Sequence, residues 1–294
     1  MVSRGRRPLW DAVFLCAILA CVAAAAYLGY RRYSAQKRAA GNDVIDSIQS
    51  ATPADLLSTA PVAPRLAGEW KLKFEDEFDG SALREIWTPH QYWDAGATIG
   101  EGDEESDPAN IQVADGSLQL TAGNQPKFGK PYTGALVQSG GIRGRSGPTF
   151  SFLYGYAEAR ISIPAGQGLW PAFWLMPAGY HDANGEIDIV DNGTGNPNVL
   201  HGGTIVHGRN YQHQHPAELW PGFHTFAVDW QKDHIAWYVD GKPWAHTADP
   251  TLICGEPMYP IFDLAVGGNW GGPPNASTHF PAVMEVDWIR VWQR

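Results

Sequence analysis

The chain has 294 residues, of which 44% are hydrophobic and 12% aromatic, and these values allow one large domain with a full core. The formal net charge is −10, and seven of the 21 basic residues precede Ala39, so the remainder holds 14 basic and 30 acidic residues. A surface this acidic repels phosphate backbones, which argues against nucleic acid as a partner. The 13 Trp residues fit either a β-sandwich core or a surface that stacks on sugar rings.

The first predicted element is a membrane-spanning helix. A basic tail over residues 1–11 precedes an uncharged apolar run over 12–30, and Arg31 and Arg32 follow it. A helix of this length can cross a hydrocarbon core of about 30 Å. The interfacial residues Tyr27 and Tyr30 favour a single-pass anchor in the cell membrane over a cleaved signal followed by secretion. The flanking charges do not decide orientation, and the domain is placed outside the cytoplasm because its expected substrate is there.

Residues 31–68 are rich in Ala, Ser, Pro and Asp without a sustained period, which predicts a flexible spacer. From Glu69 to Arg294 the pattern changes to short alternating segments broken by Gly, Pro, Asn and Asp. Examples are 117–121, 157–163 and 226–230, and Asp240-Gly241 marks a hairpin turn. The pattern predicts an all-β domain over 69–294, a sandwich or jelly roll of two antiparallel sheets.

The segment Glu186–Asp191 places three acids in six residues. Glu186 and Asp188 alternate with isoleucines, so both project from one strand face. Strict alternation would turn Asp191 into the core and Val190 outward, at a cost in free energy for both. A β-bulge near Ile189-Val190 removes this conflict and brings Asp191 back beside the other two acids. The residues alone leave catalysis, calcium binding and a solvated acidic strand open.

The wider pattern resembles glycoside hydrolase family 16, over roughly 69–294. The matching segments, in chain order, are Phe74–Gly80, Tyr154–Arg160, Gly168–Pro177, Gly185–Asp191, Thr204–His207, Phe223–Trp230, Leu264–Trp270 and Val286–Trp292. The resemblance implies a concanavalin-like jelly roll with substrate in its concave face. It also implies an endo-acting, retaining hydrolase of β-1,3- or mixed-linkage β-glucan, or of a related exopolysaccharide.

In this resemblance Glu186 is the nucleophile that forms a glycosyl-enzyme intermediate, Asp188 tunes its ionisation, and residue 191 is the acid and base. The bulged spacing resembles the laminarinase-like β-1,3-glucanases more than the lichenases. One position departs from the family pattern: Asp191 stands where the family has Glu, and Asp is shorter by about 1.5 Å. A working hydrolase, a transglycosylase that remodels exopolysaccharide, and a catalytically dead glycan binder therefore remain open.

The resemblance further implies a sugar-binding set. Trp170 and Trp174 share strand parity, and Trp174 is favoured as the one that lines the groove. His207 is expected near the catalytic acids, and Trp270 lies in a Gly-rich loop that lets a sugar approach closely. The acidic run 103–107 is read as a solvated loop at the groove rim.

No cofactor is expected for catalysis. The resemblance implies a structural calcium on the convex side, held by the Asp287 carboxylate and by backbone oxygens near Glu77 and Gly116. The expected partners are a polysaccharide substrate and, through the N-terminal helix, a membrane. The oligomeric state is left open.

Overall fold

The computed structural model describes residues 64, 66–91, 100–178, 185–193, 195–196 and 198–294. The basic tail 1–11, the predicted membrane helix 12–30 and the spacer, apart from residues 64 and 66–68, lie outside these residues. Within the described part, no helix is long and apolar enough to span a bilayer.

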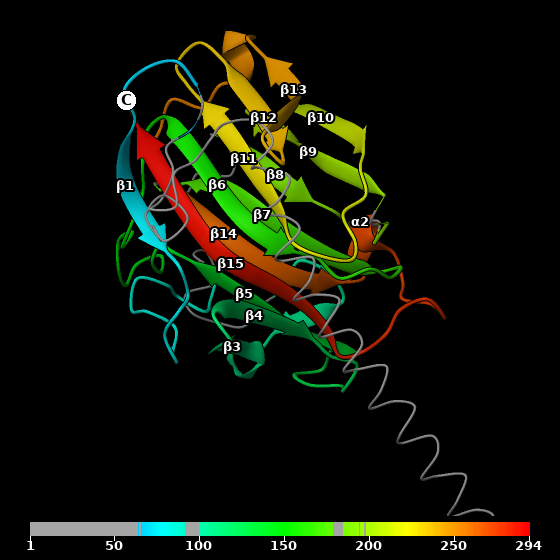
Figure 1. Ribbon diagram of the computed structural model, residues 1–294. Coiled ribbons are helices and arrows are strands. Elements are labelled where there is room, and N and C mark those ends of the chain that lie inside the picture. The colour runs from blue at the N-terminus through cyan, green and yellow to red at the C-terminus, as the bar shows by residue number, and fades with distance from the viewer. Residues whose placement is uncertain (1–63, 65, 92–99, 179–184, 194, 197) are drawn as a thin grey trace, which may run out of the picture. The chain divides into compact units, whose positions relative to one another are not determined.

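The described part of the domain is built from strands, as the alternating segments predict, with only short helical turns (Figure 1). The strands are β1 (Lys71–Asp76), β2 (Glu104–Ser106), β3 (Ile111–Ala114), β4 (Ser117–Ala122), β5 (Tyr132–Gln138), β6 (Gly155–Ser162), β7 (Leu169–Pro177), β8 (Glu186–Asp191), β9 (Val199–Val206), β10 (Arg209–Pro216), β11 (His224–Trp230), β12 (Ile235–Val239), β13 (Lys242–Thr247), β14 (Met258–Val266) and β15 (Ala282–Gln293). The helical turns are η2 (Pro108–Asn110), η3 (Pro250–Leu252) and α2 (Gly268–Gly271).

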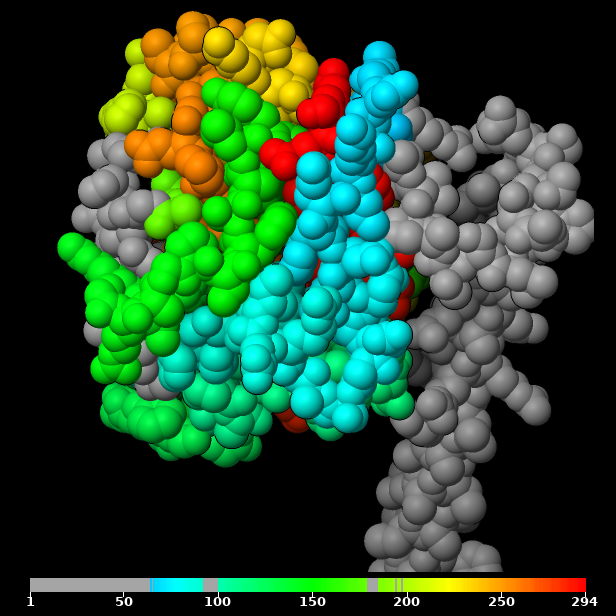
Figure 2. All heavy atoms as spheres, turned by 90° about the vertical axis from the view of Figure 1, so that its left-hand side faces the viewer, coloured from blue at the N-terminus to red at the C-terminus, as the bar shows by residue number. Residues whose placement is uncertain are grey.

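The strands form the two sheets of a jelly-roll sandwich. One has eight strands, in the order β13-β12-β11-β6-β15-β4-β3 with β1 also paired to β15, and the other has seven, in the order β10-β9-β8-β7-β14-β5-β2. Figure 2 shows β1, in cyan, against the red C-terminal strand. The prediction of two antiparallel sheets is confirmed with one exception, because β2 pairs with β5 in parallel.

The core lies between the sheets and is dominated by aromatic side chains. Trp230, Trp237 and Phe226 from the eight-stranded sheet are fully buried, as are Phe173 and Phe262 from the seven-stranded sheet. Side chains of this size provide most of the hydrophobic free energy of a sandwich. The core therefore fixes one face of the seven-stranded sheet inward and leaves the opposite face, called the site face below, for polar groups.

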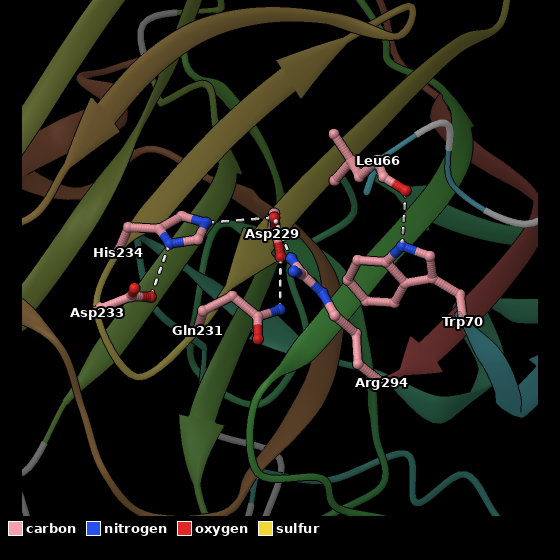
Figure 3. Close-up of polar contacts among 7 residues, drawn as sticks. All are labelled: Leu66, Trp70, Asp229, Gln231, Asp233, His234 and Arg294. Atoms are coloured by element: carbon pink, nitrogen blue, oxygen red, sulfur yellow. Dashed lines mark hydrogen bonds and ion pairs between the residues drawn. The ribbon is translucent and has the colours of Figure 1, made fainter. Parts of the chain in front are cut away.

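A polar cluster on the outer face of the eight-stranded sheet ties the chain's C-terminal residue to β11 (Figure 3). The buried Asp229 carboxylate accepts a hydrogen bond from Arg294 at 3.1 Å, and His234 Nε2 lies 3.3 Å from the same oxygen. The Arg294 guanidinium also lies 4.4 Å from the ring centre of Trp70, whose indole donates to the Leu66 carbonyl. This cluster joins the segment before β1 to the end of β15, in the sheet that does not contain β8.

Candidate active site

The predicted bulge in β8 is confirmed. Ala172 on β7 pairs with Asp191 and Phe173 with Val190, but Trp174 pairs with Asp188, so Ile189 has no partner in the register. Ile187, Ile189 and Val190 are at most 1% exposed and belong to the core between the sheets. The extra residue therefore turns Asp191 back toward the side of Glu186 and Asp188, and the three acids share the site face.

Glu186 and Asp188 form a hydrogen-bonded pair. Asp188 is 3% exposed, and burial followed by the neighbouring Glu186 raises its pKa well above the usual value. Burial also raises the pKa of Glu186, while the hydrogen bond from Asp188 lowers it. The hydrogen bond from Asp188 to Glu186 thus favours the ionised form of Glu186 and disfavours that of Asp188.

Asp188 has a second partner that sequence reasoning missed. Gln212 on β10 donates through Nε2 to Asp188 Oδ2 at 2.7 Å. The two residues lie on either side of Gly203 on β9, which pairs with both. An added Cβ at Gly203 would stand 2.1 Å from the Tyr211 carbonyl oxygen and 2.9 Å from the side chain of Gln212. Glycine at 203 therefore leaves the space through which Gln212 reaches Asp188.

Asp191 is bounded by two tryptophans. Trp170 donates through Nε1 to Asp191 Oδ1 at 2.5 Å, and the indole nitrogen of Trp270 lies 3.5 Å from the Asp191 carbonyl oxygen. Burial, followed by the neighbouring Asp188, raises the pKa of Asp191 to about 7, against the lowering effect of the Trp170 hydrogen bond. At neutral pH a large fraction of Asp191 is thus protonated, as a proton donor requires.

The expected preference for Trp174 over Trp170 finds no support in the exposure of the two rings. Trp174 is 8% exposed and packs with Leu136, Tyr259 and Ile261 on the site face, whereas Trp170 is half-buried. Trp174 donates through Nε1 to the buried Asp263 carboxylate at 2.8 Å. Trp170 and Trp270 are therefore more accessible than Trp174, and the roles of all three rings as sugar contacts stay predictions.

His207 lies in the turn between β9 and β10, two residues after Ile205, which pairs with Glu186. Its φ is 49° and its ring is exposed. Among the described residues, it makes no hydrogen bond with the three acids. Its role as a sugar contact stays a prediction.

The acidic run 103–107 is not simply a solvated loop. Glu104 is 1% exposed, and its carboxylate accepts hydrogen bonds from the backbone of Glu101, Gly102 and Val266. It therefore fastens the loop before β2 to the end of β14. The sequence did not predict this contact because Glu104 and Val266 are 162 residues apart.

Two further polar residues near the acids were also missed. Protein atoms around the Glu101 carboxyl displace water, and this desolvation, followed by the charge of Glu104, raises the pKa of Glu101. The residue is exposed at the surface, so solvent screens part of both effects. His201 on β9 is 4% exposed, contacts Trp270 edge-on at 5.3 Å between ring centres, and has its pKa lowered by burial. A neutral imidazole thus backs the Trp270 ring.

Comparison with known proteins decides the family. The model of the glycosyl hydrolases family 16 matches residues 103–290. The chain belongs to this family. It is 32% identical over 260 residues to a β-glucanase of Rhodothermus marinus, covering 77% of this chain and 86% of that protein. It is 33% identical over 278 residues to glucan endo-1,3-β-glucosidase A1 of Niallia circulans, covering 81% of this chain but only 40% of that longer protein.

Among solved structures, the endo-β-1,3-glucanase of Pyrococcus furiosus aligns with a TM-score of 0.67 and 28% identity. The alignment covers 76% of this chain and 94% of that chain. The resemblance to family 16, the all-β sandwich and the assignment as a glycosidase are therefore confirmed.

The family-16 resemblance also implied a calcium held by the Asp287 carboxylate and by backbone oxygens near Glu77 and Gly116, and the Asp287 and Glu77 side chains already have partners. The Asp287 carboxylate lies 2.5 Å from Arg160 Nη1, and Glu77 is bound by Arg290 through both carboxylate oxygens. A guanidinium group thus pairs with the predicted Asp287 ligand, and among the described residues no group of three or more His, Cys, Asp or Glu is arranged for a metal, a finding that does not bear on backbone oxygen ligands. Calcium binding at this place stays a prediction of the resemblance alone.

Metal removal is therefore expected to leave stability unchanged. The thermal midpoint of unfolding should agree within error in EDTA and in millimolar CaCl2, because Arg160 supplies at Asp287 the positive charge that calcium would otherwise provide. Differential scanning calorimetry in both buffers checks this. A midpoint several degrees higher with calcium would restore the predicted site.

The carboxylates of the site face predict that this domain loses stability as pH rises from about 4 to about 7. Asp191, with its pKa near 7, and Asp263, with its pKa raised well above its usual value by burial, hold protons in the folded state that they lose when unfolded. The folded state then binds more protons than the unfolded state, so the free energy of unfolding falls by about 1.4 kcal/mol per pH unit for each full proton of difference. Calorimetry across this range checks the slope.

Asp263→Asn is the matched variant for this titration. It keeps the side-chain shape and removes one buried carboxylate, so its midpoint should fall less steeply with pH than that of the wild type. Identical slopes for both proteins would show that Asp263 does not titrate as proposed.

Proposed function

We propose that the chain is a retaining endo-β-glucanase that cleaves β-1,3- or mixed-linkage glucan, or a related exopolysaccharide. The observation that carries the proposal is the bulge of β8, which gathers Glu186, Asp188 and Asp191 on one face. Proteins that are 28% to 33% identical to this chain are named as glucanases, and these names support the choice of substrate.

The proposed reaction has two displacements. Asp191 gives its proton to the glycosidic oxygen while Glu186 attacks the anomeric carbon, so that the C–O bond to the leaving sugar breaks and a glycosyl ester forms. Asp191, now ionised, takes a proton from water, the water attacks the anomeric carbon, and the bond to Glu186 breaks. Asp188 holds Glu186 by a hydrogen bond and keeps its own proton throughout.

The raised pKa of Asp191 supports the first step, because a carboxyl that is largely protonated at neutral pH can serve as an acid. Trp170 restrains Asp191 in turn, because its indole N–H holds Oδ1 on the side of β7. Because Asp191 is short and is also held by Trp170, two alternatives to hydrolysis are kept. They are a transglycosylase and a protein that binds glucan without cleaving it.

Product analysis separates the three functions. Incubation with laminarin and with mixed-linkage glucan is expected to release reducing ends and short oligosaccharides. Products longer than an oligosaccharide donor would instead identify a transglycosylase. Binding without any product would contradict the enzyme and leave the glucan-binding function.

Gln212 offers a test of the proposed pair that does not touch the reacting carboxyls. Gln212→Leu removes the donor to the buried Asp188 and is expected to lower kcat by about 10-fold, or about 1.4 kcal/mol of barrier, with little change in KM, because Asp188 loses the contact that holds it beside the reacting Glu186. The unsatisfied acceptor should also lower the free energy of unfolding by about 1–3 kcal/mol. Steady-state kinetics on laminarin checks this. Gln214→Leu, two residues along the same exposed face of β10, is the control and should keep wild-type kcat. An unchanged kcat for Gln212→Leu would show that Asp188 needs no support from β10.

We further propose that residues 12–30 anchor the domain outside the cytoplasm, with 31–68 as spacer and 69–294 as the catalytic domain. The apolar run and its basic flanks support the anchor. The full chain should sediment with membranes and resist extraction by alkaline carbonate, and a reporter fused to Arg294 should be active only outside the cytoplasm. Recovery of a shortened chain from the medium would instead support signal cleavage.

A further inference from the structure

Trp220 exposes its ring where most tryptophans of the domain are buried. It precedes β11 and is 55% exposed, whereas Trp230, Trp237 and Trp292 are at most 2% exposed. An exposed indole forfeits the free energy of burial, and it offers a rigid apolar face to a ligand. Trp270 beside Asp191 is the other tryptophan among the exposed large hydrophobic residues of the described part.

Trp220 forms one wall of an open cleft of about 460 Å³. The volume suits a small ligand. The side chains that face Trp220 are amides, a hydroxyl and an imidazole: Gln167, Asn196, Asn275, Ser277 and His279. The described lining contains no Asp, Glu, Lys or Arg, so the cleft has no ion-pair partner for a phosphate, a carboxylate or an amine. An aromatic face opposite neutral hydrogen-bonding groups matches a neutral sugar ring.

Backbone and side-chain contacts join three of the four segments that line the cleft, 165–167, 195–196 and 275–279, and Trp220 is the fourth. The Gly166 amide donates to the Gly195 carbonyl at 3.2 Å, and a Cβ at Gly195 would stand 1.8 Å from the Gly166 carbonyl oxygen. The backbone of Gln167 accepts from the Thr278 hydroxyl at 2.5 Å and donates to Ser277 Oγ at 3.2 Å. The site is therefore formed before a ligand arrives, which lowers the entropic cost of binding.

Two walls of the cleft continue segments of the active site. The Gly195 amide donates to the carbonyl of Asn192, the residue after Asp191. The side-chain amide of Gln167 donates to the Gly271 carbonyl, next to Trp270. Trp270 in turn packs so closely on Gly193 that an added Cβ there would stand 1.8 Å from its ring. The cleft is therefore joined to the segments that carry Asp191 and Trp270.

We propose that the Trp220 cleft is an accessory subsite for a neutral hexose unit of the same glucan chain, beyond the sugars at the catalytic carboxylates. The identity of the glucan rests on the proposed function. The location and the chemistry of the extra sugar contact are what this proposal adds. The indole stacks on one face of the ring, while the amides of Gln167, Asn196 and Asn275 bind its hydroxyls. The subsite is occupied only when the substrate is long enough to reach it.

Chain-length dependence tests the subsite. In the wild type, kcat/KM should rise from laminaritriose to laminarihexaose and longer oligosaccharides. Trp220→Ala should lower the value for the longest by roughly 3- to 10-fold through KM, the range of one aromatic contact, and leave laminaritriose unchanged. Trp220→Phe should recover most of the loss. Phe128→Ala is the control, because Phe128 is also 55% exposed and is absent from the cleft.

Calorimetric binding of laminarihexaose to Glu186→Gln, with and without Trp220→Ala, repeats the comparison without turnover. A weaker affinity in the double variant supports the subsite even if the wild type proves to be a glucan binder and hydrolysis fails. Equal affinity and an unchanged length profile would overturn the subsite while the proposed hydrolase stands. No binding of the hexaose by either protein would overturn both.

Discussion

Glu186→Gln is expected to lower kcat/KM on laminarin by about 10⁴-fold or more, because removal of a covalent nucleophile abolishes the path through the glycosyl ester. The amide has nearly the same shape as the carboxylate, so oligosaccharide binding should persist. Stability should be equal or higher, because burial raises the pKa of Glu186 and therefore opposes its charge. Initial rates, calorimetric affinity and the thermal midpoint together check these three statements.

The matched control is Glu75→Gln on the exposed side of β1, in the other sheet. It makes the same chemical change and should keep wild-type rates. Turnover by Glu186→Gln within tenfold of the wild type would show that the nucleophile is a different residue.

Asp191→Asn is expected to cost about 10²- to 10⁴-fold in kcat on laminarin, because the amide can neither give a proton to the glycosidic oxygen nor take one from water. The loss should be much smaller for the first step on an aryl glucoside, since its leaving group needs no proton. In the wild type, kcat/KM should fall as pH rises through about 7, because Asp191 loses its proton there. Kinetics on both substrates from pH 5 to 9 checks these results.

Asp191→Glu is the second half of this test. The longer side chain adds about 1.5 Å of reach, so kcat should be retained or increased if the short Asp limits proton transfer. A loss as large as that of Asp191→Asn would show that the site is shaped around Asp. An unchanged rate in Asp191→Asn would remove Asp191 from the mechanism.

The bulge of β8 could be predicted from six residues, because strict alternation would have buried one carboxylate and exposed a valine, and both are unfavourable. The two-sheet fold could be predicted for the same reason: alternating segments need a second apolar layer to cover one face. Local patterns of this kind report which face a side chain occupies. They do not report which distant strand lies beside it.

Contacts between segments that are far apart in the sequence could not be predicted from these local patterns. The bond from Gln212 to Asp188 depends on the register of three strands and on the missing side chain of Gly203. The burial of Glu104 depends on Val266, at the other end of the domain's sequence. Trp174 is less exposed than Trp170 and donates a hydrogen bond to Asp263 on the neighbouring strand β14. Strand parity alone does not predict this contact.

Glu186 is expected to form a covalent bond to the sugar during the reaction. An activated 2-deoxy-2-fluoro-β-glucoside, or its laminaribiosyl analogue, slows the second displacement and should accumulate the glycosyl ester. Mass spectrometry of the digested protein is expected to find the sugar on the peptide that contains Glu186, and no label in Glu186→Gln. A label on another residue, or an unlabelled protein that still hydrolyses laminarin, would contradict the proposed mechanism.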